Sequence, residues 1–272
     1  MNSNIPAILI QGKFYDSFTY KLVQYYTNIL KYHIIIISCW EDCIINESIT
    51  SNTNIHIIKN KIPKFPGSQN INFQRITTLA GLKYIKKLGI TKAIKTRSDH
   101  KINNINEILS TISNKIIVLK SCKFFLNPFF VCDFIYFGSV TKLITIFDFP
   151  LSNEIDDRKI LLNKLSFLKK ELLHYQMKSF IFAESRIMLK FFLKTNSFTE
   201  SRFTNFLNWR SFRKSEFTFI PINKYNVLTI KDYASLNYSE RVYSFEYFNF
   251  LLYIISSTLF INKIKLYIFK LN

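Results

Sequence analysis

Apolar runs alternate with helix-like stretches in the first half of the chain. Residues 6–12 (PAILIQG) form a short apolar run closed by Gly12, and residues 33–40 (HIIIISCW) form a continuous β-branched run. Such runs are typical of strands that are buried on both faces of a sheet. The stretch 17–32 between them has helical length, and Ser17 is its expected cap.

The same alternation continues through residue 120. Residues 54–60 predict a third strand, and residues 71–89 a helix with lysines opposite its apolar face and Gly89 at its end. Residues 91–99 return to a strand pattern, residues 104–113 predict a short helix, and residues 115–120 a further strand. We therefore expect an α/β fold with a mostly parallel sheet and helices on both faces.

The pattern loosens after residue 120. A strand or hairpin arm is expected around residues 130–137, followed by a helix from Ser139, and residues 158–195 are mainly helical in pattern. We predict a main catalytic domain over residues 1–215 and a mainly helical extension over residues 216–272 packed on it.

An apolar run of 15 residues, 247–261, lies near the end of the sequence and is followed by Lys263, Lys265 and Lys270. A membrane-spanning helix needs about 20 residues, so this run is short for that purpose. Two interpretations stay open, namely a helix packed on the core or an interfacial helix on an anionic membrane. The second predicts liposome binding that depends on residues 246–270.

The chain is strongly basic, with 37 Lys and Arg against 18 Asp and Glu and a formal charge of +19. This favours anionic partners, namely nucleic acid, an acidic membrane surface or phosphorylated small molecules. The abundance of Ile, Asn, Lys, Phe and Tyr suggests an AT-rich genome, so part of the lysine content reflects codon use. We expect no nucleic-acid partner.

The four cysteines lack disulfide-scaffold density and paired C-x-x-C spacing, so we expect reduced thiols rather than a zinc site. The first residues, MNSNIPAILIQG, lack the pattern of a signal peptide. The expected location is the cytoplasm, with peripheral binding to the inner face of the plasma membrane.

Three segments lie at the carboxyl ends of predicted strands: Gln11-Gly12, Cys39-Trp40-Glu41 and Arg97-Ser98-Asp99. Ligands of parallel α/β sheets bind beyond the carboxyl ends of the strands. We therefore treat the three segments as one candidate site.

Asp99 is the most informative residue of this group. A carboxylate at a strand end can hold Mg²⁺ or Mn²⁺ against a diphosphate, and Arg97 or Lys95 could bind the phosphate oxygens directly. The alternatives are an Asp that caps the helix near Asn103 or pairs with Arg97. His100 is either part of this chemistry or a surface loop residue.

The segment 65–75 (FPGSQNINFQR) places the amides of Asn70, Asn72 and Gln74 before or within the first turn of a helix. These amides could bind a base or a sugar, or they could serve only as caps and turn residues. Neither a Gly-x-Gly-x-x-Gly segment nor a Walker loop occurs, which argues against those phosphate-binding folds.

Four segments together resemble lipopolysaccharide-synthesis proteins of the WavE type. They are, in order, AILIQGKF, IIIISCWED, PGSQNINFQRITTLAGLKYIKKLGITKAIKTRSDHKI and FVCDFIYFGS. The resemblance covers about residues 5–145, with a further match at 183–189. It implies a bacterial glycosyltransferase of GT-A-like architecture that acts in surface-polysaccharide or capsule assembly.

Under this resemblance, the segment from Arg97 to Asp99 binds the metal and the diphosphate of a nucleotide-sugar, with Asp99 as metal or ribose ligand. The residues that would lie against the donor are Gln11, Gly12, Trp40, Glu41, Asn72, Gln74, Arg97 and Ser98. The sequence departs from the family pattern at Phe73, where an Arg is expected, so either Arg75 replaces that contact or the donor binds differently.

An inverting transferase needs a base that removes the proton of the acceptor hydroxyl. The resemblance places Asp133 near a saccharide or lipid-linked acceptor, and Glu184 at a helix start is the other candidate. Two rival functions use the same features: a sugar-phosphate transferase and a non-enzymatic module that binds anionic polymers.

Overall fold

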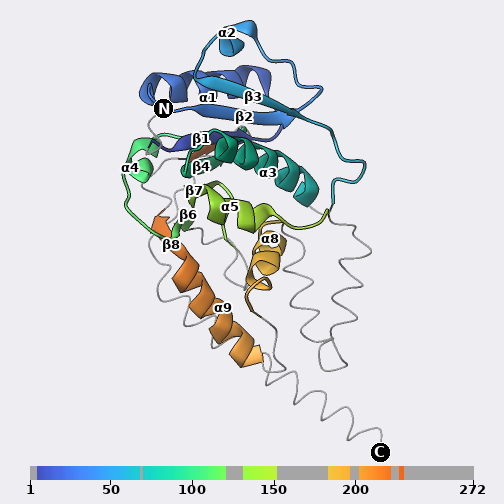
Figure 1. The fold of residues 1–272 in the computed structure, drawn as a ribbon, viewed down its shortest axis with the longest axis vertical. Coiled ribbons are helices and arrows are strands. Elements are labelled where there is room, and N and C mark those ends of the chain that lie inside the picture. Colours follow the sequence, from blue (N-terminus) through green and yellow to red (C-terminus); the bar gives the residue numbers. More distant parts are fainter. Residues whose placement is uncertain are drawn as a thin grey trace, which may run out of the picture.

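The computed structural model describes residues 5–67, 70–120, 131–151, 183–196, 202–221 and 227–229. The apolar run 247–261 therefore lies outside the described residues. In chain order the elements are β1 (Ala7–Gln11), α1 (Asp16–Ile29), β2 (Ile35–Trp40), α2 (Glu47–Thr50), β3 (Ile55–Asn60), α3 (Ile71–Lys87), β4 (Lys92–Arg97), β5 (His100–Ile102), α4 (Ile105–Leu109), β6 (Ile116–Lys120), β7 (Ile135–Ser139), α5 (Val140–Phe147), α8 (Ala183–Phe192), α9 (Arg202–Glu216), β8 (Phe217–Pro221) and β9 (Val227–Thr229) (Figure 1).

A seven-stranded sheet in the order β3-β2-β1-β4-β7-β6-β8 forms the centre of the molecule. Its strands run parallel except for β7, which is antiparallel to both β4 and β6. The prediction of a mostly parallel α/β sheet is confirmed. No described helix reaches the combination of length and apolarity that crossing a bilayer requires.

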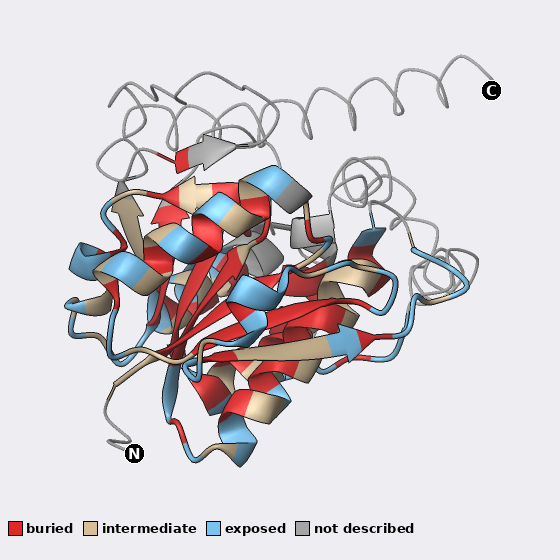
Figure 2. Cartoon of the chain, turned by 90° about the horizontal axis from the view of Figure 1, so that it is seen from above, coloured by how far each residue is buried: buried red, intermediate tan, exposed pale blue. Residues whose placement is uncertain are grey.

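Helices cover both faces of the sheet. Because residues of a strand point alternately to opposite sides, each strand contributes to a core on each face. Ala7 and Leu9 of β1 join the core under α3, α5 and α8, whereas Ile8 and Ile10 join the core under α1 and α4. The buried strands lie between these helical layers in Figure 2. Burial on both faces explains why β1 and β2 read as mainly apolar runs.

Helix α3 lies so close to β1 that one position must be glycine. A Cβ atom on Gly81 would come within 2.2 Å of Cδ1 of Leu9, a fully buried side chain. Leu9 belongs to the core under α3, and because protein interiors are closely packed, a shift of this side chain disturbs its neighbours.

We expect Gly81→Ala to lower the free energy of unfolding by about 1–3 kcal/mol, because the overpacking outweighs the gain in helix propensity. Urea unfolding followed by circular dichroism measures this. The reverse change one residue earlier, Ala80→Gly, is the control and should cost about 1 kcal/mol through propensity alone. A Gly81→Ala protein as stable as the parent would show that α3 can move away from β1.

The strand order reverses between β1 and β4. From β1 the chain proceeds outward to β2 and β3, and it then returns to place β4 on the other side of β1. The crevice at such a reversal, beyond the carboxyl ends of the two strands, is the usual ligand site of an open α/β sheet. Residues that follow β1 and β4 are therefore placed for ligand binding.

Several element boundaries differ from the sequence predictions. Helix α1 has Tyr15 at its cap position instead of Ser17, and Oγ1 of Thr19 accepts a hydrogen bond from the Tyr15 amide. The strand predicted over residues 91–99 ends at Arg97, and Ser98 and Asp99 form a turn into β5. The helix predicted from Ser139 begins at the next residue, and Gly89 follows α3 with a positive φ of 76° as expected.

Long-range pairing contributes strands that the sequence did not predict. β5 pairs antiparallel with β9, and β8 extends the main sheet beside β6. β8 therefore places residues 217–221 of the predicted C-terminal extension in the main sheet. Apart from Glu216 and β9, the rest of that extension lies outside the described residues, so the domain boundary stays a prediction.

Candidate functional site

The carboxyl ends of β1, β2 and β4 meet at one edge of the sheet, as the strand pattern predicted. Gln11 and Arg97 are register partners, and the Ser98 amide donates to the Gln11 carbonyl at 3.0 Å. The Gly12 amide donates to the Ser38 carbonyl at 3.0 Å. These backbone bonds bring the Gln11-Gly12 segment beside the turn that carries Asp99.

Gly12 allows the Gln11-Gly12 segment to approach the turn at Ser98 this closely. Its φ is 120°, and a Cβ atom at this position would lie 2.9 Å from Oγ of Ser98. Only glycine adopts such a backbone conformation without strain. Gly12 therefore has a packing role at the edge, whatever ligand binds there.

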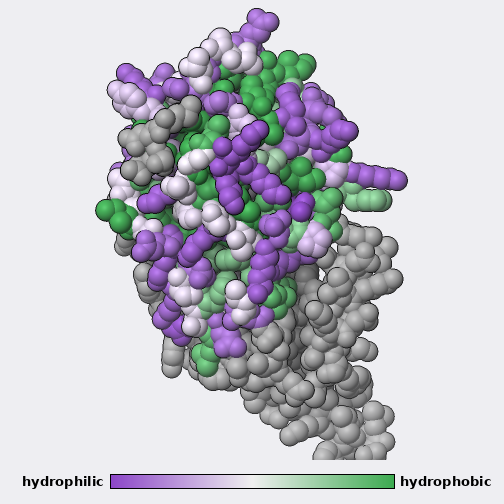
Figure 3. All heavy atoms as spheres, viewed as in Figure 1, coloured by the Kyte–Doolittle hydropathy of each residue, from purple (hydrophilic) through white to green (hydrophobic). Residues whose placement is uncertain are grey.

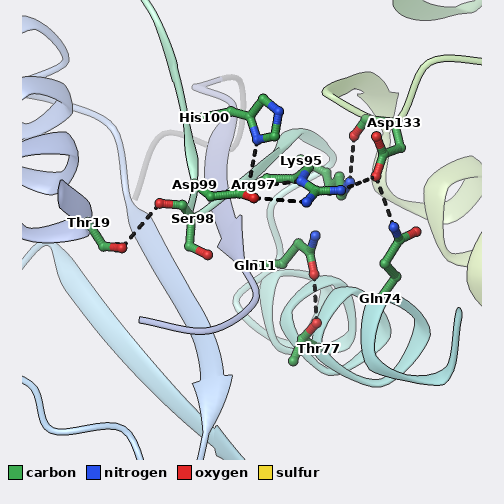
Figure 4. Close-up of polar contacts among 10 residues, drawn as sticks. All are labelled: Gln11, Thr19, Gln74, Thr77, Lys95, Arg97, Ser98, Asp99, His100 and Asp133. Atoms are coloured by element: carbon green, nitrogen blue, oxygen red, sulfur yellow. Dashed lines mark hydrogen bonds and ion pairs between the residues drawn. The ribbon is translucent and has the colours of Figure 1, made fainter. Parts of the chain in front are cut away.

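Arg97 is the centre of the site (Figure 4). Its Nε and Nη2 donate to the two carboxylate oxygens of Asp99, and its Nη1 donates to Oδ2 of Asp133, each at 2.9 Å. Burial lowers the pKa of Arg97, but the two carboxylates outweigh it and raise the pKa well above the ordinary value. A guanidinium group has five N–H donors, so within the described chain two remain for a ligand. The Arg97 side chain is 26% exposed, so a ligand can reach it.

Asp99 is held by Arg97 and by a neighbour that the sequence left ambiguous. Nδ1 of His100 lies 2.6 Å from Oδ1 of Asp99. Burial raises the pKa of Asp99, but hydrogen bonds and charges from Arg97 and His100 outweigh it and hold the pKa far below its usual range. The structure shows Asp99 paired with Arg97, which was one of the alternatives for this residue. Asp99 does not cap the helix that follows, because α4 has no side-chain cap. His100 is buried, so a surface loop position was the wrong alternative.

Asp133 belongs to the same cluster, although it lies far away in sequence. Its Oδ2 accepts from Nε2 of Gln74 at 3.0 Å as well as from Arg97, and its carbonyl accepts from Nζ of Lys95 at 2.7 Å. The side chain is only 2% exposed. Burial raises the pKa of Asp133, but the charges of Arg97 and Lys95 outweigh burial and lower the pKa below its ordinary value. Asp133 therefore stays ionised.

Lys95 is fully buried, with its ammonium group near the rings of Tyr136 and Phe147. It cannot reach a phosphate at the surface, so of the two cations considered for that role only Arg97 is accessible. Lys95 and Arg97 carry two positive charges, and Asp99 and Asp133 carry two negative ones. The charges of these four side chains therefore balance one another.

Three of the predicted binding residues, Gln11, Ser98 and Asn72, form hydrogen bonds that connect neighbouring elements. Thr77 of α3 donates to Oε1 of Gln11 at 2.7 Å, and Thr19 of α1 donates to the carbonyl of Ser98 at 3.1 Å. Nδ2 of Asn72 donates to the carbonyl of Phe65 at 3.0 Å. The side chains of Gln11 and Asn72 therefore make turn and packing contacts at the edge.

The aromatic and cationic candidates lie around the cluster. Trp40 is buried and packs against Phe73, with ring centroids 4.9 Å apart. Phe73, which replaces the expected Arg, thus fills the space between the end of β2 and α3. Glu41 is exposed, and Arg75 lies over the ring of Phe149.

Two observations point to unused binding capacity near the start of α3, where Gln74 contacts Asp133. Oε1 of Gln74 is buried and has no hydrogen-bond partner within the described chain, and the same holds for Nε of Arg75. Burial lowers the pKa of Arg75, partly offset by the charge of Asp148. A buried acceptor and a buried donor without partners are costly, so groups of this kind suit a polar ligand.

Glu184, the other predicted base, lies in α8. Its side chain is outside the described residues, so its relation to the cluster stays a prediction.

The side chains of the cluster, as arranged, do not fit a resident divalent metal ion. Both oxygens of Asp99 are occupied by Arg97, and Oδ2 of Asp133 accepts two bonds. Within the described ranges no group of three His, Cys, Asp or Glu side chains is placed to hold a metal. Among the described cysteines Cys39, Cys43 and Cys132 none forms a disulfide, and Cys122 is outside the described residues.

Sequence reasoning did not assign roles to Thr77 or to the buried form of Lys95. Lys95 could have been predicted, because residues 93–96 lie in a central strand that is covered on both faces. A lysine there must be buried and must find an internal acceptor.

The comparisons with known proteins give distant structural likeness and no match in sequence. The chain matches no protein-family model and no curated protein. One similar solved structure is a Bacillus anthracis protein described as a glucose-1-phosphate thymidylyltransferase, at 9% identity over 89% of this chain and 94% of that chain, with a TM-score of 0.40. Another is the glycosyltransferase GlyE of Streptococcus pneumoniae TIGR4, at 11% identity over 80% of this chain and 46% of that chain, with a TM-score of 0.36. Values this low assign neither a family nor an activity, so the WavE-type resemblance stays a prediction.

Proposed function

We propose that the protein is a glycosyltransferase that moves a sugar from a nucleotide-sugar to a saccharide or lipid-linked acceptor in lipopolysaccharide or capsule synthesis. The observation that carries this proposal is Arg97, a partly exposed side chain whose guanidinium is fixed by two carboxylates at the strand-order reversal of the sheet. A fork held in this way is suited to bind paired phosphates.

In the proposed reaction the bond between the sugar C1 and the diphosphate oxygen breaks, and negative charge builds on the departing nucleoside diphosphate. The two N–H groups of Arg97 that have no partner within the described chain stabilise this charge without reorganising, because Asp99 and Asp133 already hold the guanidinium. Asp99 is thus a positioning residue, and the exposed Lys13 next to Gly12 adds positive charge at the same edge.

The acceptor hydroxyl must lose its proton as the new bond to C1 forms. Asp133 is poorly suited to take that proton, because it is almost fully buried and its pKa is lowered. We therefore propose that Asp133 orients Arg97 and that Glu184 is the base that takes the proton.

Donor binding can be tested by thermal shift with a panel of nucleotide-sugars, each measured with Mn²⁺ and with EDTA. We expect at least one donor to raise the melting temperature, and to do so in both buffers, because Arg97 carries the phosphate-binding charge. The corresponding nucleoside alone is the control and should give a smaller shift. A shift seen only with Mn²⁺ would assign the phosphate contact to a metal ion instead.

Product analysis by mass spectrometry tests the reaction itself. The proposal requires an acceptor heavier by one sugar and free nucleoside diphosphate. Phosphate retained in the product would indicate sugar-phosphate transfer. Binding of anionic polymer that falls steeply with salt, and no turnover of any donor, would indicate a non-enzymatic module.

A further inference from the structure

Three large apolar side chains are exposed on two loops at the carboxyl edge of the sheet. The loops follow β2 (residues 41–46) and β3 (residues 61–67), and we refer to them as the rim loops. Ile44 is 84% exposed, Phe65 66% and Ile62 45%. Single exposed apolar residues are common on proteins, but several on neighbouring loops indicate an interaction surface.

The two rim loops lie side by side because their strands are paired. Trp40 and Asn60 are register partners, and the Glu41 amide donates to the Asn60 carbonyl at 2.9 Å. Nζ of Lys59 donates to the carbonyl of Cys43, which joins the first loop to β3.

The second rim loop is fixed at its far end by α3. Asn72 accounts for two bonds there, from its side chain to the Phe65 carbonyl and from its amide to the Pro66 carbonyl, each at 3.0 Å. The backbone around Phe65 is therefore anchored while the ring points outward. This fixed presentation distinguishes the rim from a loose loop.

Positive charge accompanies these apolar side chains. Lys61 and Lys64 alternate with Ile62 and Phe65, and Nζ of Lys64 lies 5.7 Å from the centroid of the Phe65 ring. Exposed charges at this edge comprise four lysines and two carboxylates, namely Lys13, Lys59, Lys61, Lys64, Glu41 and Asp42. Figure 3 shows apolar and polar side chains intermixed over this part of the molecule.

We propose that the rim loops dock on a lipid bilayer that contains anionic headgroups. Ile44, Ile62 and Phe65 enter the boundary between headgroups and acyl chains, and the lysines remain at the phosphate level. Docking in this way turns the edge that carries Arg97 toward the membrane. Under the proposed function, a lipid-linked acceptor would then reach the site from the bilayer, but the docking itself does not depend on that function.

The docking can be tested with a tryptophan probe in the full chain. The native residues Trp40 and Trp209 are buried, so Phe65→Trp adds an exposed indole to a shielded background. We expect its emission to shift to shorter wavelength on addition of vesicles with anionic lipid, and to be quenched by brominated acyl chains. An emission maximum that does not move while the protein sediments with the vesicles would overturn the proposal.

Vesicle co-sedimentation of the full chain provides the second arm. We expect the combined variant Ile44→Ser, Ile62→Ser and Phe65→Ser to reduce affinity for anionic vesicles by at least about tenfold, since three apolar contacts are lost. The matched control is Ile112→Ser, which changes an isoleucine that is 95% exposed before β6, at the opposite edge of the sheet. Equal losses in both variants, or affinity that depends on salt but not on the rim side chains, would contradict the proposal.

Discussion

Replacing Asp99 with Asn will lower the rate of sugar transfer by at least about a hundredfold while the fold survives, since a fixed charge donor at the leaving group contributes a factor of this order. Asp99 accepts two hydrogen bonds from Arg97, one on each oxygen. An Asn side chain has one acceptor and one donor group, so its NH₂ opposes the guanidinium. Arg97 then loses the orientation that its phosphate contacts require.

Steady-state kinetics and circular dichroism of the purified variant check this expectation. A positioning role predicts that kcat falls more than KM rises, and that Asp99→Glu, which keeps both oxygens, retains more activity than Asp99→Asn. The matched control is Asp42→Asn, an exposed carboxylate at the same edge, assayed with a water-soluble acceptor. An Asn variant that transfers sugar at the parental rate would remove Asp99 from the mechanism.

The central layer of the fold was predictable because buried parallel strands leave a direct mark on sequence. β1 and β2 are buried at every position, so Ala7–Gln11 and Ile35–Trp40 read as almost entirely apolar runs, with Gln11 and Ser38 as their polar residues. The antiparallel direction of β7 and the pairing of β5 with β9 were not predictable in this way. They depend on contacts between residues such as Ile102 and Val227, which lie far apart in the chain.

The position of the site followed from strand ends, but the contacts within it did not. That Gln11 and Arg97 lie together follows from parallel register at the strand-order reversal. That Arg97 binds both Asp99 and Asp133 depends on where residues 131–139 return to the sheet, and no local pattern encodes this return. The packing role of Gly12, by contrast, could have been predicted from its position at the end of a strand, where neighbouring segments approach closely.

Arg97→Met should lower the free energy of unfolding at pH 7 by about 3–5 kcal/mol, because it removes the guanidinium that pairs with the partly buried Asp99 and the buried Asp133 and leaves them only His100 and Gln74 as side-chain partners. The folded-state pKa values of Asp99 and Asp133 are lowered, so their contribution to stability is present at neutral pH and is lost only as the pH falls through those values. Without the guanidinium, both pKa values rise relative to those of the parent, because burial is then opposed only by the contributions of His100 and Lys95. The variant therefore gains stability relative to the parent as the carboxylates become protonated. Urea unfolding should therefore show a smaller difference in the free energy of unfolding between parent and variant near pH 4 than at pH 7.

Two further proteins separate the ion cluster from general effects of losing an arginine. Arg210→Met removes an exposed arginine of α9 and should change stability by less than about 0.5 kcal/mol, as most surface substitutions do. Adding Asp99→Asn and Asp133→Asn to Arg97→Met removes the unpaired charges and should recover part of the loss, since residues in one network are not additive. A single variant Arg97→Met that is as stable as the parent at pH 7 would mean that Asp99 and Asp133 are solvated or protonated, and the preorganised guanidinium on which phosphate binding is argued would not exist.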